Sequence, residues 1–194
     1  RLVRGKEGER RAGTGVDTRA GFVYSMPEGR THVWYRPAAG GAGAVADRAM
    51  REVVEIRCKS VLNKVTSQRM PFRWSINPYR GCEHKCVYCY ARRYHTFLDL
   101  NPAGDFENKI FVKVNAPEVL RQELARPGWP REKVAIGTAV DPYQPVEGKY
   151  KLTRRILEAL LEADTPCSIV TKNAMIRRDL DLFTQLGRGP GCTV

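Results

Sequence analysis

The sequence of 194 residues predicts an α/β protein in which residues 50–194 form repeated βαβ units, arranged as a partial (β/α) barrel. The main observation is an alternation of short runs rich in β-branched residues with longer segments of helical apolar periodicity. A second observation is that polar residues follow these short runs, as they do at the carboxyl ends of strands in a parallel barrel. Units of this kind wind right-handed and build a parallel sheet.

The first 49 residues differ in composition and are predicted to form a flexible leader rich in Arg, Gly and Ala. The stretch 37–46 is of low complexity and has little apolar surface to bury. An apolar patch at 31–35 is expected to dock onto the body of the protein. Residues 50–65 carry a short apolar packing element that leads toward the cysteine-containing segment.

The segments after residue 90 alternate between predicted helices and strands. Pro117 in a first turn and Glu118 beside the positive end of the dipole favour a helix that opens at Asn115. Five Leu and Ile residues between 152 and 161 fall on one helical face. The elements predicted in order are a helix over 90–98, a strand over 109–114, a helix from 115 to about 125, a strand over 134–136, a helix over 152–161, a strand over 168–171, a helix over 180–186 and the start of a strand at 192–194.

Polar side chains stand where three of the predicted strands end. Asn115 follows the first strand, Thr138 and Asp141 follow the second, and Lys172 follows the third. Each could cap the next helix, and for Asn115 capping and a functional role are open alternatives. A lysine is disfavoured at a helix N-terminus by the dipole. Lys172 therefore indicates an anionic ligand, such as a carboxylate.

Cys82, Cys86 and Cys89 form a Cys-x3-Cys-x2-Cys pattern within the run 77–90. An iron–sulfur cluster normally takes four protein ligands, so a set of three is informative because one is missing. Three thiolates this close can hold three irons of an iron–sulfur cube and leave the fourth iron free for a small molecule. The pattern therefore predicts a cluster with one open coordination position.

A non-enzymatic zinc module is the alternative interpretation, with His84, His95 or Cys58 as the fourth ligand. Zinc sites usually appear in sequence as two separated pairs of ligands. This chain has one tight triplet and no second pair. Cys167 and Cys192 are isolated in apolar contexts and are interpreted as small buried hydrophobic residues.

Composition and charge restrict the remaining function classes. The net charge of +12 is typical of proteins that bind nucleic acid, but the basic residues are spread without a long run. Nucleic acid is therefore a possible partner that charge alone does not establish. No apolar stretch reaches the roughly 18 residues that a membrane span needs. With no secretory signal and no need of a disulfide framework, we expect a reducing, cytoplasmic location and no membrane partner.

The cysteine pattern, with the aromatic Tyr88 directly before its third cysteine, resembles that of the radical S-adenosylmethionine (SAM) enzymes. Four segments, at 77–82, 112–117, 137–150 and 170–172, are similar to a subfamily related to spore photoproduct lyase, in particular to its actinobacterial members of unassigned reaction. The resemblance covers about residues 50–194. It implies a partial (β/α) barrel of the radical SAM type.

The resemblance implies a [4Fe–4S] cluster ligated by Cys82, Cys86 and Cys89, with the amino and carboxylate groups of SAM on the fourth iron. The reduced cluster would cleave SAM to methionine and a 5′-deoxyadenosyl radical, which abstracts hydrogen from an unknown substrate. An electron donor such as a flavodoxin or a ferredoxin is implied as a partner. The protein would supply orientation and exclude water, because the radical chemistry belongs to the cofactor.

The same resemblance assigns roles to the strand-end residues. Tyr88 matches a position that packs near the adenine, and Lys172 matches a lysine that approaches the SAM carboxylate. Asn115, Thr138 and Asp141 are expected to hold the ribose, the methionyl group or the substrate.

Two departures from the family are visible. In the lyase, a cysteine at the strand end aligned near Thr138 returns a hydrogen atom to the product radical, and a threonine hydroxyl is a poor hydrogen-atom donor. This departure disfavours photoproduct repair. A DNA-directed repair reaction, which the basic charge would suit, is kept as an alternative function. The family core also carries further strands after the one that begins at Cys192. We thus expect the core to be incomplete at its C-terminus, which puts the activity of this fragment in question.

Overall fold

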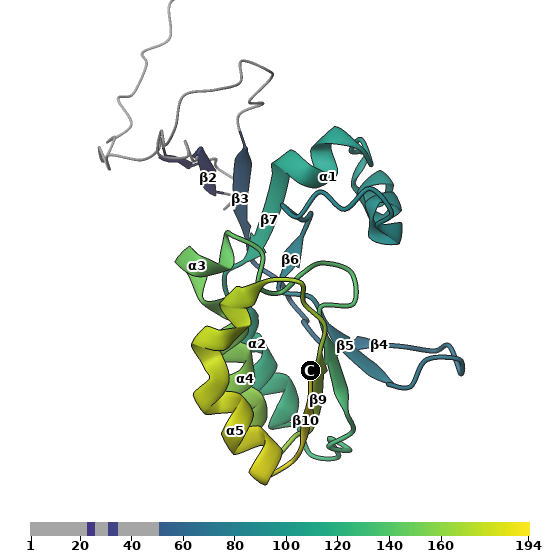
Figure 1. Ribbon diagram of the computed structural model, residues 1–194, viewed down its shortest axis with the longest axis vertical. Helices are drawn as coiled ribbons and strands as arrows, with labels where there is room; N and C mark the ends of the chain where they lie inside the picture. Colours follow the sequence, from purple (N-terminus) through teal and green to yellow (C-terminus); the bar gives the residue numbers. More distant parts are fainter. Residues whose placement is uncertain (1–22, 26–30, 35–50) are drawn as a thin grey trace, which may run out of the picture.

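The computed structural model describes residues 23–25, 31–34 and 51–194 and confirms the α/β class predicted from the sequence. The strands lie in two five-stranded sheets (Figure 1). In spatial order the first sheet contains β1 (Val23–Ser25), β2 (Thr31–Trp34), β3 (Glu52–Ile56), β7 (Lys109–Lys113) and β6 (Tyr79–Arg80). The second contains β10 (Cys192–Thr193), β9 (Cys167–Ile169), β8 (Val134–Ile136), β5 (Trp74–Ile76) and β4 (Asn63–Lys64).

The helices follow the predicted order closely. The α-helices are α1 (Gly104–Asn108), α2 (Ala116–Leu124), α3 (Glu147–Tyr150), α4 (Leu152–Glu162) and α5 (Leu180–Arg188). Two segments are 3-10 helices, η1 (Tyr90–Leu98) and η2 (Ala174–Asp179). The helix predicted over 90–98 thus has the expected bounds with a tighter winding, and α1, α3 and η2 were not predicted.

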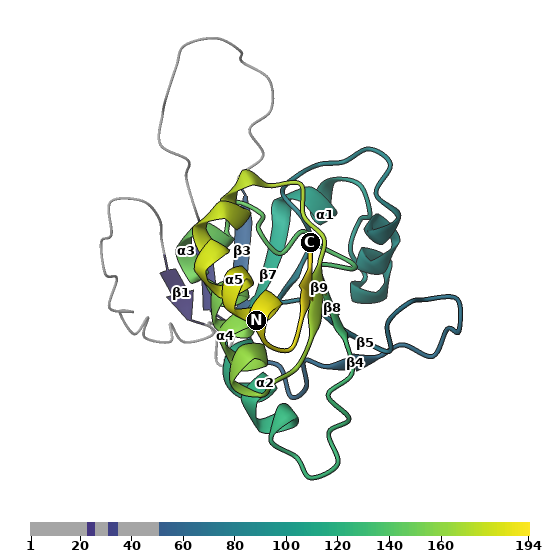
Figure 2. The ribbon, with the colours of Figure 1, turned by 60° about the horizontal axis from the view of Figure 1, so that its bottom comes forward.

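The second sheet is the parallel sheet that the alternating pattern predicts. β5, β8, β9 and β10 pair in parallel, and only β4 runs antiparallel to its neighbour. Helices α2, α4 and α5 lie side by side over one face of this sheet (Figure 2). Two consecutive parallel strands must be joined by a connection that crosses back along the sheet, and these helices form part of such connections.

The main core lies between this sheet and its helices. Ile136 and Ile169 from the strands pack with Leu120, Leu157 and Leu186 from the helices, and all five are at most 2% exposed. Burial of each such side chain stabilises the fold by about 1.5–3 kcal/mol. The last helix, predicted over 180–186, buries only part of its apolar residues. Leu182 is buried, but Leu180 is 59% exposed, because a spacing of two residues places it on another face of the helix.

The first sheet contains the segments before residue 50 that the structure describes. β2 pairs antiparallel with β3, and β1 pairs antiparallel with β2. Residues 31–34 of the predicted apolar patch therefore dock through backbone hydrogen bonds to the edge of β3, and residue 35 lies outside the described residues. These two strands differ from the flexible leader expected over 1–49, and the rest of that prediction lies outside the described residues.

The chain passes from one sheet to the other just before the cysteines. β5 ends at Ile76 in the second sheet, and β6 begins at Tyr79 in the first. The Ile76 carbonyl accepts a hydrogen bond from Gly137 N after β8, and the Pro78 carbonyl accepts one from Lys113 N at the end of β7. The carboxyl ends of β5, β7 and β8 are thereby gathered beside the cysteines. Within the described residues the two sheets share no strand, and no barrel is shown.

No helix in the described part of the chain is long and apolar enough to cross a membrane.

Candidate functional site

Cys82, Cys86 and Cys89 lie in one loop, residues 81–89, between β6 and η1; we call it the cysteine loop. It begins at Gly81, whose φ of +79° suits glycine and where a Cβ would come 2.5 Å from the Lys109 carbonyl oxygen. Cys82 N then donates to the Phe106 carbonyl at 2.8 Å, and Cys89 N donates to the Cys86 carbonyl at 3.1 Å. The loop is therefore tied to the helix–strand unit α1–β7 at its start and turns back on itself at its end.

The three thiols occupy different environments within this loop. Cys82 is 7% exposed and belongs to a small apolar cluster with Ala91 and Phe106, against which Cys89 also packs. Burial raises the pKa of the Cys82 thiol. Cys86 is half-buried. Among the described residues, no group of three or more His, Cys, Asp or Glu side chains is arranged to hold a metal ion.

Gln144 holds the backbone on both sides of Cys82. Its side-chain NH2 donates to the Gly81 carbonyl at 3.1 Å, and its side-chain oxygen accepts from Glu83 N at 3.0 Å. Gln144 is fully buried. Glu83 returns the contact, because its carboxylate accepts from Val146 N at 2.7 Å. The segment 141–146, after β8, therefore holds the cysteine loop in place, and we call it the clamp segment.

Lys172 reaches the cysteine loop from the end of β9. Its ammonium lies 3.4 Å from Cys86 Sγ, donates to the hydroxyl of Tyr88, and sits 4.2 Å from the centre of the Tyr88 ring. Tyr88 is 76% exposed, and Lys172 is also exposed. The strand-end cation and the aromatic residue of the cysteine pattern, 84 residues apart in sequence, are thus brought together as the sequence predicts for one site.

Asp141 joins the ends of β8 and β9 to the cysteine loop. One carboxylate oxygen accepts from Thr171 Oγ1 at 2.6 Å and from Tyr143 N at 2.9 Å. The other accepts from Lys172 N at 2.8 Å and lies 3.3 Å from His84 Nε2. The contact with His84 is close but is not a hydrogen bond, since that nitrogen has no hydrogen-bond partner among residues 51–194 and the other described positions. Asp141 therefore positions Lys172 through its backbone.

Thr138 lies at the other side of the loop and is held by Asn77. Asn77 Nδ2 donates to Thr138 Oγ1 at 3.1 Å, and Asn77 Oδ1 accepts from Ala139 N at 2.8 Å. The Tyr90 hydroxyl donates to the Thr138 carbonyl. Both polar atoms of the Asn77 amide are used in this way, so Asn77 fixes the end of β8 against the end of β5.

Asn115 does not share a contact with these residues. Its side-chain oxygen accepts from Cys58 N at 2.8 Å, and its NH2 donates to the Cys58 carbonyl at 2.9 Å. It stands at the N-cap position of α2 without a side-chain capping bond. The side-chain amide of Asn115 therefore holds the backbone of the segment after β3. This role differs from both predicted roles, which were capping of the next helix and ligand binding. Asn173, by contrast, caps η2 by accepting from Met175 N at 2.9 Å.

The candidate fourth zinc ligands are in three separate environments. His84 faces Asp141, and Cys58 has its backbone held by Asn115. His95 is buried against the rings of Phe106 and Phe111. Cys167 and Cys192 were interpreted as small buried hydrophobic residues, and Cys167 is buried whereas Cys192 is half-buried. The two are paired in register on β9 and β10, with their sulfur atoms 3.4 Å apart.

A network of buried acidic residues and arginines contacts the clamp segment through Tyr143. Arg178 donates to Glu147 at 2.7 Å and to Asp179 at 2.8 Å, and Asp179 also accepts from Tyr143 at 2.9 Å and from Arg154 at 3.0 Å. The side chains of both acids have no exposed surface. Sequence reasoning missed this network because neither its helix η2 nor the burial of its acids has a local signal.

No family model matches this chain, and no solved structure matches it. Uncharacterized proteins of Mycobacterium tuberculosis and Mycobacterium bovis are each 52% identical to it over 132 residues, which cover 68% of this chain and 39% of the relative. An uncharacterized protein of Methanocaldococcus jannaschii is 31% identical over 133 residues, which cover 68% of this chain and 47% of the relative. This chain therefore spans less than half the length of the relatives that it matches, and they transfer no activity to it.

Proposed function

We propose that this chain carries the cluster- and SAM-binding residues of a radical SAM enzyme whose substrate is unassigned. The observation that carries the proposal is the contact of Lys172 with Cys86 and Tyr88. An exposed ammonium beside a thiol and over an aromatic ring is suited to a ligand with a carboxylate, a flat base and a metal-chelating end. SAM has all three.

The donor set is compatible with a [4Fe–4S] cluster. Thiolates are the protein ligands of such clusters, and Cys82, Cys86 and Cys89 lie in one loop. A cubane takes one thiolate per iron, so its three thiols need not converge on a single point as zinc ligands must. The ammonium of Lys172 also places a positive charge next to Cys86, where a thiolate ligand would carry negative charge. These residues therefore fit the cluster in ligand type and charge.

Different residues of the chain would bind the cluster and the separate parts of SAM. Cys82, Cys86 and Cys89 would hold the cluster, which when bound supplies the electron for SAM cleavage and one open iron. Lys172 would bind the methionyl carboxylate, and Tyr88 would pack against the adenine. Asp141 would set the position of Lys172. Gln144 would keep the backbone around Cys82 in one conformation.

The remaining parts of the proposal concern the whole protein. The parallel pairing of β5, β8, β9 and β10, with helices on one face, supports a partial (β/α) barrel completed by further strands. An electron donor such as a flavodoxin or a ferredoxin would dock near the exposed end of the cysteine loop, where Val87 and Tyr88 are 91% and 76% exposed. A cytoplasmic location agrees with the reducing conditions that such a cluster needs.

Anaerobic reconstitution with iron and sulfide tests the proposal directly. We expect a cubane signal in the electron paramagnetic resonance of the reduced protein, and we expect its shape to change when SAM is added. The Cys82→Ala, Cys86→Ala and Cys89→Ala variants should each lose the signal. Cys58→Ala, at a partly buried cysteine outside the loop, is the matched control and should keep it. Tight zinc binding without a paramagnetic signal would refute the proposal.

A second variant separates SAM binding from cluster assembly. Lys172→Ala should keep the cubane signal but weaken SAM binding about tenfold or more, because a charge-assisted hydrogen bond is lost. Lys172→Arg should restore part of the affinity. Unchanged SAM affinity in Lys172→Ala would remove Lys172 from the site and leave the assignment of the cluster intact.

A further inference from the structure

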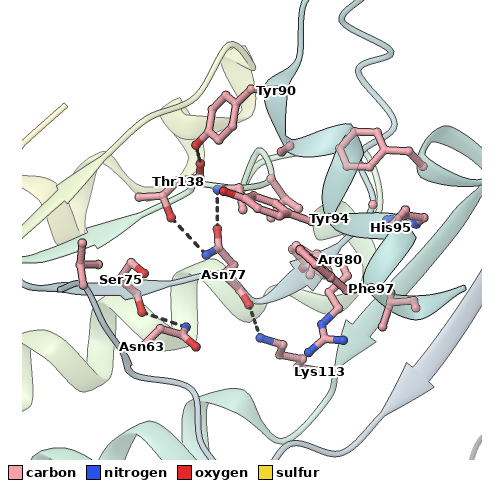
Figure 3. Close-up of a pocket in the computed structure, with 18 of the residues that line it drawn as sticks. Asn63, Ser75, Asn77, Arg80, Tyr90, Tyr94, His95, Phe97, Lys113 and Thr138 are labelled. Carbon is pink, nitrogen blue, oxygen red and sulfur yellow. Dashed lines mark hydrogen bonds between the residues drawn. The ribbon is translucent and has the colours of Figure 1, made fainter. Parts of the chain in front are cut away.

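A cavity of about 750 Å³ lies next to the cysteine loop, between η1 and the β4–β5 hairpin (Figure 3). Its volume is in the range of small-molecule binding sites, roughly 300–1,000 Å³. Its wall includes Gly81, directly before Cys82, and Ala139, directly after Thr138. Figures 1 and 2 show η1 and the β4–β5 hairpin on the side of the molecule away from α2, α4 and α5. None of the residues assigned above to SAM other than Thr138 lines it.

Two cations line this cavity without a carboxylate. Lys113 is 8% exposed, and its ammonium donates to the Asn77 carbonyl at 2.8 Å. Arg80 extends toward Lys113 in Figure 3. Neither residue forms an ion pair within the described part of the chain, and no Asp or Glu is among the described lining residues. The cavity wall therefore carries positive charge that the protein does not neutralise there.

The electrostatics of the wall agree with this arrangement. Burial lowers the pKa of Lys113, and the charge of Arg80 lowers it further. Burial also lowers the pKa of His95, and Arg80 again adds to the effect. Burying a cation without a counter-ion is costly. A bound anion would offset this cost for Lys113.

His95 adds an unsatisfied polar atom to the same wall. The residue is 1% exposed, and its Nε2 has no hydrogen-bond partner among the described residues. Buried polar atoms nearly always have a partner, so an orphaned ring nitrogen at a cavity is informative. The nitrogen is therefore one hydrogen-bond partner short within the described part of the chain.

Three aromatic residues of η1 stand at the mouth of the cavity. Tyr90, Tyr94 and Phe97 are 59%, 39% and 79% exposed. Tyr94 lies edge-on to Tyr90 at 6.1 Å and stacked with Phe97 at 6.3 Å between ring centres. Exposed rings gathered in this way favour stacking with a flat ligand, at about 1–3 kcal/mol per stacked base in nucleic-acid sites.

We propose that this cavity binds an organic anion of nucleotide size, with its charged group beside Lys113 and Arg80 and its planar ring against Tyr94 and Phe97. The site requires no metal, so it stands independently of the proposed radical SAM function. If that function holds as well, the ligand would lie beside the cysteine loop, where a substrate is needed.

Isothermal titration calorimetry of the cluster-free chain tests this site with three probes. Uridine 5′-monophosphate has both the ring and the anion, uridine has only the ring, and inorganic phosphate has only the anion. We expect the nucleotide to bind about tenfold or more tightly than either part. Equal binding of phosphate and nucleotide would overturn the role of the rings, and equal binding of uridine would overturn the role of the cations. A single-stranded oligonucleotide that binds when the mononucleotide does not would overturn the small-molecule proposal in favour of a nucleic-acid surface.

Variants locate the binding. Lys113→Met removes the charge at similar volume, and Arg80→Gln removes the exposed cation with little risk to folding. Each should weaken nucleotide binding about tenfold, and Phe97→Ala should weaken it without changing the affinity for phosphate. Lys109→Met, on the same strand but outside the cavity lining, is the matched control and should bind normally. If Lys113→Met does not fold, Arg80→Gln alone decides, and wild-type affinity in that variant would refute the site.

Discussion

The carboxylate of Asp141 accepts a hydrogen bond of 2.8 Å from the backbone N–H of Lys172. This bond joins the loop after β8 to the end of β9. It leaves the ammonium of Lys172 free to reach the cysteine loop, because the carboxylate is occupied by backbone and hydroxyl donors rather than by the ammonium.

Removal of the Asp141 carboxylate should loosen the end of β9. In Asp141→Ala the N–H of Lys172 loses a charged acceptor, and in Asp141→Asn an NH2 group would face either that donor or the Thr171 hydroxyl. We expect backbone hydrogen exchange at 171–173 to become about tenfold faster in both variants. Asp164→Asn, at an exposed surface pair with Arg131, should leave exchange there unchanged. Wild-type exchange rates in Asp141→Ala would contradict the role given to this residue.

Gln144→Ala should disturb the backbone conformation of the cysteine loop, although Gln144 hydrogen-bonds to the backbone of this loop and not to a thiol. The change leaves the Gly81 carbonyl and the Glu83 N–H without their side-chain partner, at about 1–3 kcal/mol for each buried group. We therefore expect less iron per chain after reconstitution. Gln185→Ala, at an exposed glutamine on α5, is the control. Iron content equal to that of the control would show that the loop does not depend on the clamp.

Asp179 should contribute most of the stability of the buried ion network. Asp179→Asn removes the buried carboxylate shared by Arg178 and Arg154, which keep only Glu147 and the more exposed Asp181 and Glu158 as charged partners among the described residues. A loss of about 3 kcal/mol in the free energy of unfolding is expected. The matched variant Asp181→Asn removes the exposed partner of the same Arg154 and should cost less than about 1 kcal/mol. Urea denaturation at neutral pH measures both. Equal losses in the two variants would contradict the buried role of Asp179.

The same network predicts a dependence of stability on pH. Burial raises the pKa of Asp179, but hydrogen bonds from Arg178, Arg154 and Tyr143 outweigh it and hold the pKa below the usual 3.8. A carboxyl with a depressed pKa in the folded state contributes stability above its unfolded pKa, and the contribution is lost as the pH falls through the folded pKa. The difference in stability between wild type and Asp179→Asn should therefore shrink below about pH 4. A constant difference down to pH 2 would contradict this assignment.

Cys167 and Cys192 should form a disulfide under mild oxidation. Their sulfur atoms are 3.4 Å apart on paired strands, so one bond can form as diamide accepts the two electrons and two protons of the thiols. The bond would close a loop between positions 25 residues apart and stabilise the chain by about 3 kcal/mol. Peptide mapping and urea denaturation after oxidation measure this effect. Cys192→Ser should abolish it and Cys58→Ala should not.

The sequence by itself determined the local elements and the chemical character of the site. Helical periodicity placed α4, the β-branched run at 109–114 placed β7, and Pro117 marked the start of α2, because each depends on neighbours in the chain. The sequence also showed the spacing of the three cysteines and the polar residues that follow the strands, because both are local features of the chain.

Only the tertiary structure decided which of these residues meet. Lys172 contacts Tyr88 across 84 residues, whereas Asn115, which carries the same strand-end signal, is turned to the backbone of Cys58. Gln144, Lys113 and the pairing of Cys167 with Cys192 depend on how the two sheets and their helices pack. Contacts between distant segments are set by burial and by the completion of hydrogen bonds in the folded chain, and neither has a counterpart in the local sequence.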